Sequence, residues 1–442
     1  MEFVLIILIC IVCIIFSYFI SRKDIMSPSI LLCLGYLMST ISCFMNKDIW
    51  ESSIHLNTIV IIFSGILSFV VMEALFNSVK KAPRKNCTSN QNKRIEIKVS
   101  NIIICLTTIF NFIVAYLYIK EIIRISGGSF SNLNKTMNAY RRAYSYGDAK
   151  ISFLPVQLMK FSKGIGFTFL FIFFNNIFIG EKKSFTKQIK YLLPSISFLL
   201  STFLLGGRIN MISFIVASIF LAYYNWNKKY EWNKKISLKM IRNILLTFLI
   251  LLIVFYFTKT IVGRTSNKTF LDYITTYLGG SIQLLDDYLN DSTVYSEEKK
   301  CETFPGIIQS LYKTGIININ AKKSLEFRHI VNGEFLGNVY TGLRRYYHDF
   351  GFFGMIIIQM LYSCFMNNIY YDLKNIKKES YTKIWKTVWY SYTLYCIMIH
   401  SIEDHFFINL SVGYIIELII IYIVIRLIIP KKYISEEKYD FK

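Results

Sequence analysis

Apolar runs of about 20 residues recur along the whole chain, and no other feature limits its folding so strongly. An α-helix of that length crosses the hydrocarbon core of a bilayer, which is about 30 Å thick. With 54% hydrophobic and 17% aromatic residues and a mean hydropathy of +0.42, the composition excludes an ordinary soluble domain. We therefore predict an all-α polytopic membrane protein, a helical bundle of about 11 spans within a range of about 10–12. The predicted spans are 3–20, 27–45, 56–76, 101–119, 153–178, 191–205, 209–225, 243–262, 351–371, 385–400 and 407–427.

Basic residues are distributed unevenly between the predicted loops. More than half of the 50 Lys and Arg residues lie in six segments on one side of the bundle: 21–26, 77–100, 179–190, 226–242, 372–386 and 426–442. By the positive-inside rule these segments are cytoplasmic, which places the large loops 120–152 and 263–350 outside. The net charge of +22 is thus explained by topology, and we expect no nucleic-acid partner.

This topology divides the chain into five consecutive segments. They are N-terminal membrane helices (1–119), a basic external loop with a surface helix (120–152), central membrane helices (153–262), a large external loop (263–350), and C-terminal membrane helices with a cytoplasmic tail (351–442). The nine cysteines show neither a disulfide framework nor the spacing of a zinc site. We therefore expect no metal ion and no cofactor.

Both external loops contain helical periodicity. In the first, Leu133, Met137, Tyr140 and Tyr144 fall on one face of a helix that we expect on the membrane surface or against the bundle. The second loop has a similar apolar stripe, formed by Leu271, Ile274, Leu278, Ile282, Leu285 and Leu289.

Arginines collect on the predicted outer side, each within a turn or two of a membrane boundary or a surface helix. They are Arg141, Arg142, Arg208, Arg264, Arg344 and Arg345. An anchor that reaches the lipid headgroups explains any one of them, but outside loops usually carry little positive charge, so it explains the set less well. Because a guanidinium is a planar fork of donors that suits phosphate, we expect an anionic ligand at the outer leaflet, such as a lipid-linked phosphate or pyrophosphate.

Histidines and carboxylates of the outer loops are the candidates for acid–base chemistry. His329 and the adjacent pair His348 and Asp349 could take a proton from a sugar hydroxyl, although a structural role is the commoner one for a single histidine. The stretch HSIEDHFF at 400–407 predicts a solvated hairpin turn. The stretch DDYLND at 286–291 predicts an exposed acidic helix end, since no second acidic cluster accompanies it as in a magnesium-binding aspartate motif.

Two carboxylates fall inside predicted spans. Glu417 lies in the middle of the last span, so it must be protonated, paired or directed at a wet cavity. Glu73 lies near the cytoplasmic end of its span, close enough to reach water.

The stretch NVYTGLRRYYHDFGFFG at 338–354 resembles the signature of the Wzy-type O-antigen and capsule polymerases, the oligosaccharide repeat-unit polymerases. It has an Asn-Val-Tyr-Thr start, an arginine, an aromatic pair, and Asp-Phe-Gly with a second glycine at the head of a span. The GGR at 206–208 and the GR at 263–264 fall where such proteins carry arginines. The plan of many spans with one large outside loop late in the chain resembles theirs over the whole sequence.

The resemblance implies a fold, a reaction and a location. Such proteins look like multispanning, lipid-sugar-dependent glycosyltransferases, and they work without a metal at the outer face of the bacterial inner (cytoplasmic) membrane. They move a growing glycan from undecaprenyl pyrophosphate to the sugar of another lipid-linked repeat unit, for capsule or lipopolysaccharide. A chain-length regulator protein is a further partner to consider.

The resemblance also suggests site residues. Asn338, Tyr340 and Thr341 are candidates for substrate binding. The related O-antigen ligases use a histidine just before the matching glycines, where this chain has Tyr340 or Thr341. The catalytic base therefore stays open among His348, Asp349 and His329, and Asp349 could instead orient one of the adjacent arginines.

Other functions are compatible with outer arginines. A flippase for lipid-linked oligosaccharides should carry charge within its spans and two similar halves, whereas here the charge concentrates in the outside loops. A membrane O-acyltransferase should show a histidine-centred motif near a cytoplasmic or intramembrane entrance, which the sequence lacks. An O-antigen ligase shares the chemistry but uses a different acceptor. We favour the polymerase, a glycosyltransferase, over these alternatives.

Overall fold

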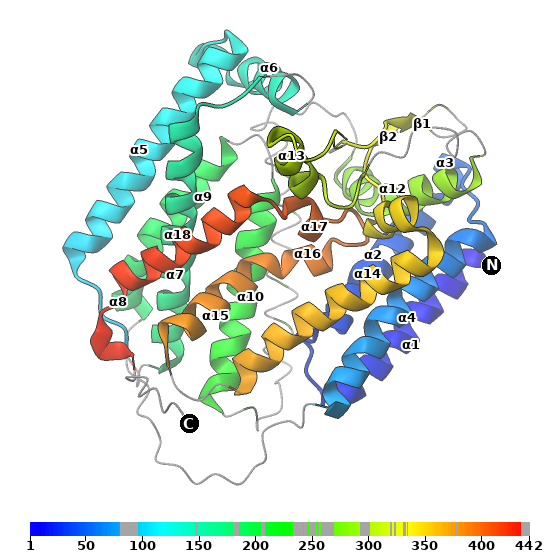
Figure 1. The fold of residues 1–442 in the computed structure, drawn as a ribbon, viewed down its shortest axis with the longest axis horizontal. Coiled ribbons are helices and arrows are strands. Elements are labelled where there is room, and N and C mark those ends of the chain that lie inside the picture. Colours follow the sequence, from blue (N-terminus) through cyan, green and yellow to red (C-terminus); the bar gives the residue numbers. More distant parts are fainter. Residues whose placement is uncertain are drawn as a thin grey trace. The chain divides into compact units, whose positions relative to one another are not determined.

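The structure is a computed structural model, and it is almost entirely helical (Figure 1). It describes residues 1–79, 96–145, 149–179, 185–204, 208–230, 269–291, 301–318, 324–329, 335–375 and 379–434, with a few single positions between them. Within these ranges the only strands are β1 (Arg328–His329) and β2 (Phe335–Gly337), which form one antiparallel pair. The prediction of an all-α polytopic membrane protein is thereby confirmed.

In the part of the chain that the structure describes, seven helices are long and apolar enough to cross a membrane. They are α1 (Glu2–Ile20), α2 (Pro28–Met45), α4 (Leu56–Val79), α5 (Asn101–Ser126), α7 (Phe153–Ile179), α10 (Ile209–Lys229) and α14 (Gly342–Asn375). Three other predicted spans contain shorter helices: α9 (Leu192–Phe203), α15 (Tyr381–Thr393) and α18 (Val412–Ile428), of 12, 13 and 17 residues. The predicted span 243–262 falls almost wholly outside the described residues. The total number of spans therefore stays a prediction.

The remaining elements are short or lie in the predicted loops. They are α3 (Lys47–Trp50), η1 (Phe130–Asn132), α6 (Leu133–Ser145), α8 (Phe185–Gln188), η2 (Ile189–Tyr191), α12 (Phe270–Asn290), α13 (Pro305–Lys313), α16 (Tyr395–Met398), α17 (Phe406–Asn409) and η4 (Lys431–Tyr433).

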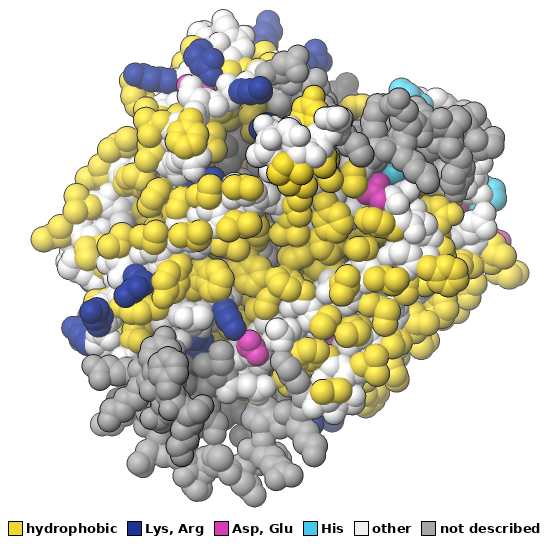
Figure 2. Space-filling view, viewed as in Figure 1, with side chains coloured by type: hydrophobic (Ala, Val, Ile, Leu, Met, Phe, Trp, Pro, Cys, Tyr) yellow, Lys and Arg dark blue, Asp and Glu magenta, His cyan; other side chains and the backbone are white. Residues whose placement is uncertain are grey.

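Large apolar side chains cover the outer faces of the long helices (Figure 2). On α1, α5 and α14 they include Leu8, Phe16, Ile102, Ile113, Phe353 and Leu361, all exposed. Exposed apolar area on this scale is unfavourable in water but is the normal surface of a helix in lipid.

The chain forms two compact units, and each combines distant parts of the sequence. The first consists of Met1–Lys85, Lys268–Asp372 and Tyr395–Ile415, and the second of Asn86–Asn267, Leu373–Leu394 and Ile416–Lys442. These units cut across the five consecutive segments predicted from topology, because packing partners are not neighbours along the chain.

In the first unit α1, α2 and α4 pack side by side, and α12 lies against α2 (Figure 1). α12 approaches α2 closely, since a Cβ atom on Gly279 of α12 would clash with the backbone of Cys43 on α2. The apolar stripe predicted for α12 is buried at Ile274, Ile282 and Leu285, whereas Leu271 at its start is exposed. Much of the predicted external loop is therefore a packed part of this unit.

Glu73 departs from its prediction, because it is buried rather than solvated. Its carboxylate accepts hydrogen bonds from Ser27 Oγ at 2.5 Å and from the backbone N–H of Ser29 at 3.0 Å. Both donors lie at the N-terminus of α2, where the first N–H groups lack helical partners. Glu73 thus caps α2 from α4.

In the second unit α7 packs with α5, α9 and α10. Glu417 on α18 is paired, as one of the predicted alternatives required: Lys163 Nζ on α7 lies 2.7 Å from its Oε1. The ammonium group also lies over the ring of Tyr392, 4.4 Å from the centroid. A carboxylate inside a membrane segment is therefore neutralised within its own unit.

The surface helix predicted in the first external loop is α6. Its Met137 and Tyr140 are buried against Ile122 of α5. Tyr144 is exposed and stacks on Tyr140, with ring centroids 5.6 Å apart. The stripe thus holds α6 against the end of α5.

Candidate functional site

The charged stretch before the ninth predicted span forms a short helix of its own. Gly351 interrupts α14 with φ 67° and ψ −170°, a conformation that is open essentially only to glycine. The break separates residues 342–350, which carry the arginines, His348 and Asp349, from the apolar helix 352–375. The membrane segment can therefore follow its own direction while the charged helix packs against neighbouring loops.

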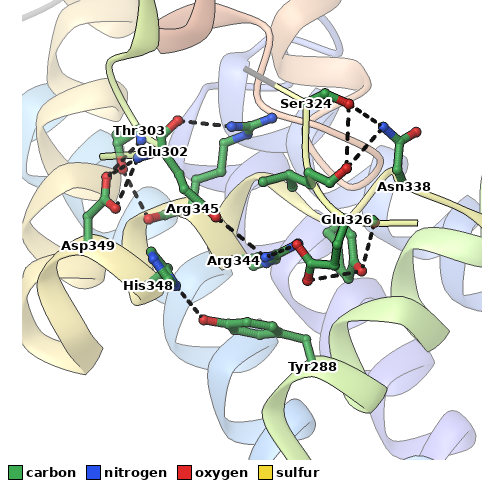
Figure 3. A network of polar contacts seen from close by, with 12 residues as sticks. Tyr288, Glu302, Thr303, Ser324, Glu326, Asn338, Arg344, Arg345, His348 and Asp349 are labelled. Carbon is green, nitrogen blue, oxygen red and sulfur yellow. Dashed lines mark hydrogen bonds and ion pairs between the residues drawn. The ribbon is translucent and has the colours of Figure 1, made fainter. Parts of the chain in front are cut away.

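Arg344 is buried, with 1% of its side chain exposed. Its Nη2 donates to Glu326 Oε2 at 2.8 Å and lies 3.5 Å from Glu302 Oε1 (Figure 3). The guanidinium carbon lies 4.2 Å and 4.0 Å from the ring centroids of Tyr288 and Tyr340, so two rings contact the cation. Its Nε and Nη1 atoms have no hydrogen-bond partner among the described residues.

Arg345 is equally buried and is held by two different groups. Its Nη1 donates to the carbonyl oxygen of Glu302 at 2.9 Å, and its Nη2 donates to Glu403 Oε1 at 3.0 Å. Glu403 lies in the turn before α17. This turn is not the solvated hairpin that the sequence predicted, because His400 and Asp404 within it are fully buried.

Asp349 fixes the turn that carries Glu302. Its carboxylate accepts the backbone N–H groups of Glu302, at 3.1 and 3.0 Å, and of Thr303, at 2.7 Å (Figure 3). The Cys301 thiol lies 3.7 Å from Oδ2, and burial together with the charge of Asp349 raises the pKa of this thiol to about 11. Asp349 therefore acts on Arg344 and Arg345 through Glu302 rather than by direct contact.

The two histidine candidates lie in different surroundings. His348 is half-buried, and its Nδ1 lies 2.8 Å from the hydroxyl of Tyr288, whose ring contacts Arg344. Burial raises the pKa of Tyr288 to about 12, although the nearby charge of Arg344 opposes this shift. His329 is exposed on the β1–β2 hairpin, with Nδ1 3.1 Å from the carbonyl of Gly333 and its ring 5.1 Å from that of Phe335. The structure thus brings His348, but not His329, to the arginines.

The predicted substrate-binding residues hold the chain segment that carries Glu326. The Tyr340 hydroxyl lies 3.3 Å from both the carbonyl oxygen and Oε1 of Glu326. Asn338 Nδ2 donates to Ser324 Oγ at 2.9 Å (Figure 3), and Thr341 is buried at the start of α14. Burial raises the pKa of Tyr340, with the charge of Glu326 adding to the shift.

The acidic stretch 286–291 is not the exposed helix end that its sequence predicted. Asp286 is buried and accepts hydrogen bonds from the backbone N–H of His55 at 2.8 Å and from Thr58 Oγ1 at 2.5 Å, which caps α4. Asp291 pairs with Arg328 at 3.0 Å. Arg328 Nε lies 3.6 Å from Glu326 Oε1, which connects this pair to Arg344.

We call the connected charged groups and their aromatic neighbours the α14 cluster. It comprises Tyr288, Asp291, Glu302, Glu326, Arg328, Tyr340, Arg344, Arg345, His348, Asp349 and Glu403. Carboxylates outnumber guanidinium groups in this set. The arginines are thus already neutralised by protein groups, and an anionic ligand would need further positive charge.

The other predicted arginines lie elsewhere. Arg141, Arg142 and Arg208 belong to the second unit, and Arg264 lies outside the described residues. Arg208 is buried just before α10, where its carbonyl accepts the N–H groups of Met211 and Ile212. Arg141 Nη2 donates to Asn138 Oδ1 at 3.3 Å, and Arg142 is exposed.

Comparison of the chain with known protein families, curated proteins and solved structures found no match. In the described part of the chain, no group of three or more His, Cys, Asp or Glu side chains could hold a metal ion. The site is therefore characterised by its own geometry. It contains a buried guanidinium with two donors that lack partners among the described residues, a buried carboxylate at Glu302 and a partly exposed one at Glu326.

Tyr288, Glu302 and Glu326 were not among the residues predicted from the sequence. Each lies in the predicted external loop 263–350, where single polar residues are usually solvated, although Tyr288 proves to lie on α12. The one available signal was physical, since buried arginines require carboxylate partners. That requirement alone does not say which of the loop carboxylates is used.

Proposed function

We propose that the protein polymerises undecaprenyl-pyrophosphate-linked oligosaccharide repeat units at the outer face of the bacterial cytoplasmic membrane. The observation that carries the proposal is Arg344, a buried guanidinium at the head of a membrane helix whose Nε and Nη1 donors lack hydrogen-bond partners among the described residues. A buried N–H donor without an acceptor is costly, so these two donors favour a ligand that accepts from them. The ligand that suits them presents phosphate oxygens at the rim of the bilayer, as a lipid-linked diphosphate does.

The reaction is a glycosyl transfer. A hydroxyl oxygen of the acceptor sugar attacks the anomeric carbon of the donor glycan, and the bond from that carbon to the diphosphate oxygen breaks. The electron pair leaves with the lipid diphosphate, so negative charge develops on its oxygens. Guanidinium groups fixed before the reaction stabilise this charge as it forms, without reorganisation. Arg344 is held for that purpose by Glu326 and by two tyrosine rings.

The charge balance of the α14 cluster indicates that Arg344 and Arg345 do not hold a diphosphate alone. We also propose the other predicted arginines, Arg141, Arg142, Arg208 and Arg264, as pyrophosphate-binding residues, because the positive-inside rule assigns each of them to the outer side. Asn338 and Tyr340 then serve substrate binding through their contacts with Ser324 and Glu326, and Thr341 does so from the start of α14.

Purified protein in detergent, incubated with lipid-linked repeat units and without added metal, tests the proposal. A ladder of products that differ by one repeat unit is the expected result, and Arg344→Ala should leave single units unreacted. Transfer of one unit to a different acceptor would indicate a ligase. Movement of the lipid across a vesicle without bond formation would indicate a flippase.

The sidedness of the site needs its own measurement. A cysteine introduced at the exposed Lys313, in a Cys301→Ser background, should react with a membrane-impermeant thiol reagent from the outside of intact cells. Reaction only after the cells are opened would place the α14 cluster in the cytosol and contradict the proposed function.

A further inference from the structure

His348 lies one helical turn after Arg344, in the charged helix 342–350. Residues four positions apart share a face of a helix, with their Cβ atoms about 6 Å apart. Both side chains also contact Tyr288 of α12. Its ring centroid lies 4.2 Å from the guanidinium carbon of Arg344, and its hydroxyl lies 2.8 Å from His348 Nδ1 (Figure 3). A sugar attached to a phosphate at Arg344 is therefore close to the imidazole of His348.

The two ring nitrogens of His348 are in different situations. Nδ1 contacts the Tyr288 hydroxyl, and His348 makes no other hydrogen bond or ion pair among the described residues. The side chain is half-buried, so it is not closed off from solvent. In a neutral imidazole one nitrogen donates and the other accepts, and the hydrogen bond of the first decides which is which. When Nδ1 donates to the Tyr288 oxygen, Nε2 carries the lone pair.

The surroundings of His348 favour this arrangement. Burial raises the pKa of Tyr288 to about 12, against the opposing charge of Arg344, so the hydroxyl stays neutral and can accept from Nδ1. Carboxylates outnumber guanidinium groups in the α14 cluster. A second proton on the imidazole therefore reduces a net negative charge instead of adding to a positive one.

We infer that His348 is the general base that takes the proton from the acceptor hydroxyl, an inference that rests on the proposed function. The acceptor oxygen bonds to the anomeric carbon of the donor glycan, and its proton passes to Nε2 of His348. The bond from that carbon to the diphosphate oxygen breaks, and its electron pair leaves with the lipid diphosphate beside Arg344. Tyr288 is a positioning residue, because it orients the imidazole without touching the reacting atoms.

The substitution His348→Gln separates a catalytic from a structural role. The amide can still form a hydrogen bond with Tyr288, but it takes up no proton at neutral pH. In detergent, with lipid-linked repeat units as substrate, we expect kcat for polymerisation to fall by about 100-fold or more, within the range for loss of a general base. The KM for the lipid-linked unit and the thermal midpoint should stay close to wild type.

His55→Gln is the matched control. His55 is another histidine whose Nδ1 is held by a protein group, since it lies 2.7 Å from Asp286 Oδ2, and it belongs to no part of the α14 cluster. We expect this variant to polymerise at the wild-type rate.

Tyr288→Phe tests the orienting contact separately, because it keeps the ring beside Arg344 and removes only the oxygen that holds Nδ1. We expect kcat to fall by about 10-fold, the rate effect of one neutral hydrogen bond. In the His348→Gln background the same substitution should cause no further loss, since its effect passes through the imidazole. An equal loss in both backgrounds would overturn the role of Tyr288 as the group that orients His348.

His348→Ala provides a test that does not depend on the amide. Imidazole added to the buffer should restore part of its rate, and should do nothing for Arg344→Ala. Polymerisation by His348→Gln within about threefold of wild type, or no rescue of His348→Ala, would overturn the inference while a product ladder from wild-type protein leaves the proposed function intact. Absence of any ladder from wild-type protein would instead overturn the proposed function.

Discussion

Arg345 Nη2 donates to Glu403 Oε1 at 3.0 Å although the two residues are 58 positions apart. The contact joins the charged start of α14 to the turn before α17. Arg345 also donates to the carbonyl of Glu302, so one guanidinium fixes two separate segments of the first unit. The pair therefore stabilises the site as well as neutralising a buried charge.

Replacing Arg345 by Met should lower the free energy of unfolding by about 2–4 kcal/mol. Removal of the guanidinium leaves the Glu403 carboxylate and the Glu302 carbonyl oxygen without their donor. Glu403→Gln should cost less, since Glu403 is partly exposed and its amide can still accept. Thermal midpoints in detergent for the two single variants and the double variant would give the coupling free energy between Arg345 and Glu403. Additive effects in this cycle would show that the pair contributes nothing.

Sequence reasoning succeeded where the bilayer imposes a length. The six predicted spans 3–20, 27–45, 56–76, 101–119, 153–178 and 209–225 correspond to α1, α2, α4, α5, α7 and α10 within a few residues at most boundaries. It failed for acidic groups in loops. Polarity suggested solvent for 286–291 and 400–407, but Asp286 caps a helix 231 positions away in sequence and Glu403 pairs with Arg345. Hydropathy reflects only residues that are neighbours in the sequence, whereas these interaction partners are far apart in the sequence.

The stability should depend on pH through Asp404, which lies in the turn before α17. Burial raises its pKa to about 7, against the opposing effects of N–H bonds from Phe407 and Phe406 and of the charge of Arg345. Because the folded pKa lies above the unfolded one, near 3.8, the folded protein binds the proton more tightly. Stability is therefore expected to fall as the pH rises from about 4 to about 7, by at most about 4 kcal/mol.

Asp404→Asn provides the check. The amide cannot ionise, and its oxygen can still accept from the N–H groups of Phe406 and Phe407, as Oδ1 does at 2.9 and 3.0 Å. Thermal midpoints measured between pH 4 and pH 7 should decline for wild type and stay nearly level for the variant. Parallel curves would mean that Asp404 does not titrate in this range.

Adjacent glycines on α12 should respond oppositely to alanine. A Cβ on Gly279 would clash with the backbone of Cys43 on α2, which cannot move aside as a side chain can. On Gly280 the nearest atom would be Leu336 Cβ at 4.0 Å, an ordinary contact. Gly279→Ala should destabilise the protein by about 1–3 kcal/mol through overpacking, whereas Gly280→Ala should be neutral or stabilise it by up to about 1 kcal/mol. Equal midpoints would contradict the packing of α12 on α2.

The sequence predicted the arginines of the candidate site but not the carboxylates that pair with them. Arg344 and Arg345 were singled out because arginine beside an apolar run requires a reason, and both prove to be buried. Glu302 and Glu326 were missed, since their positions depend on how Asp349 and Tyr340 fold the external segments against α14. A guanidinium has a recognisable chemistry in any context, whereas a loop carboxylate acquires its role from tertiary contacts.

Arg344→Lys tests whether the shape of the guanidinium matters or only its charge. A lysine ammonium could still pair with Glu326, but it has no planar fork with which to contact the rings of Tyr288 and Tyr340 and present further donors. We expect a folded protein whose polymerisation rate is about 100-fold lower, the usual effect of losing one preorganised donor at a developing anion. Arg124→Lys, at an exposed pair outside the α14 cluster, should polymerise normally. Sizing of the polysaccharide products from both variants distinguishes a role of the guanidinium shape from a role of the charge alone. Long chains made by Arg344→Lys would show that only the positive charge of Arg344 is needed.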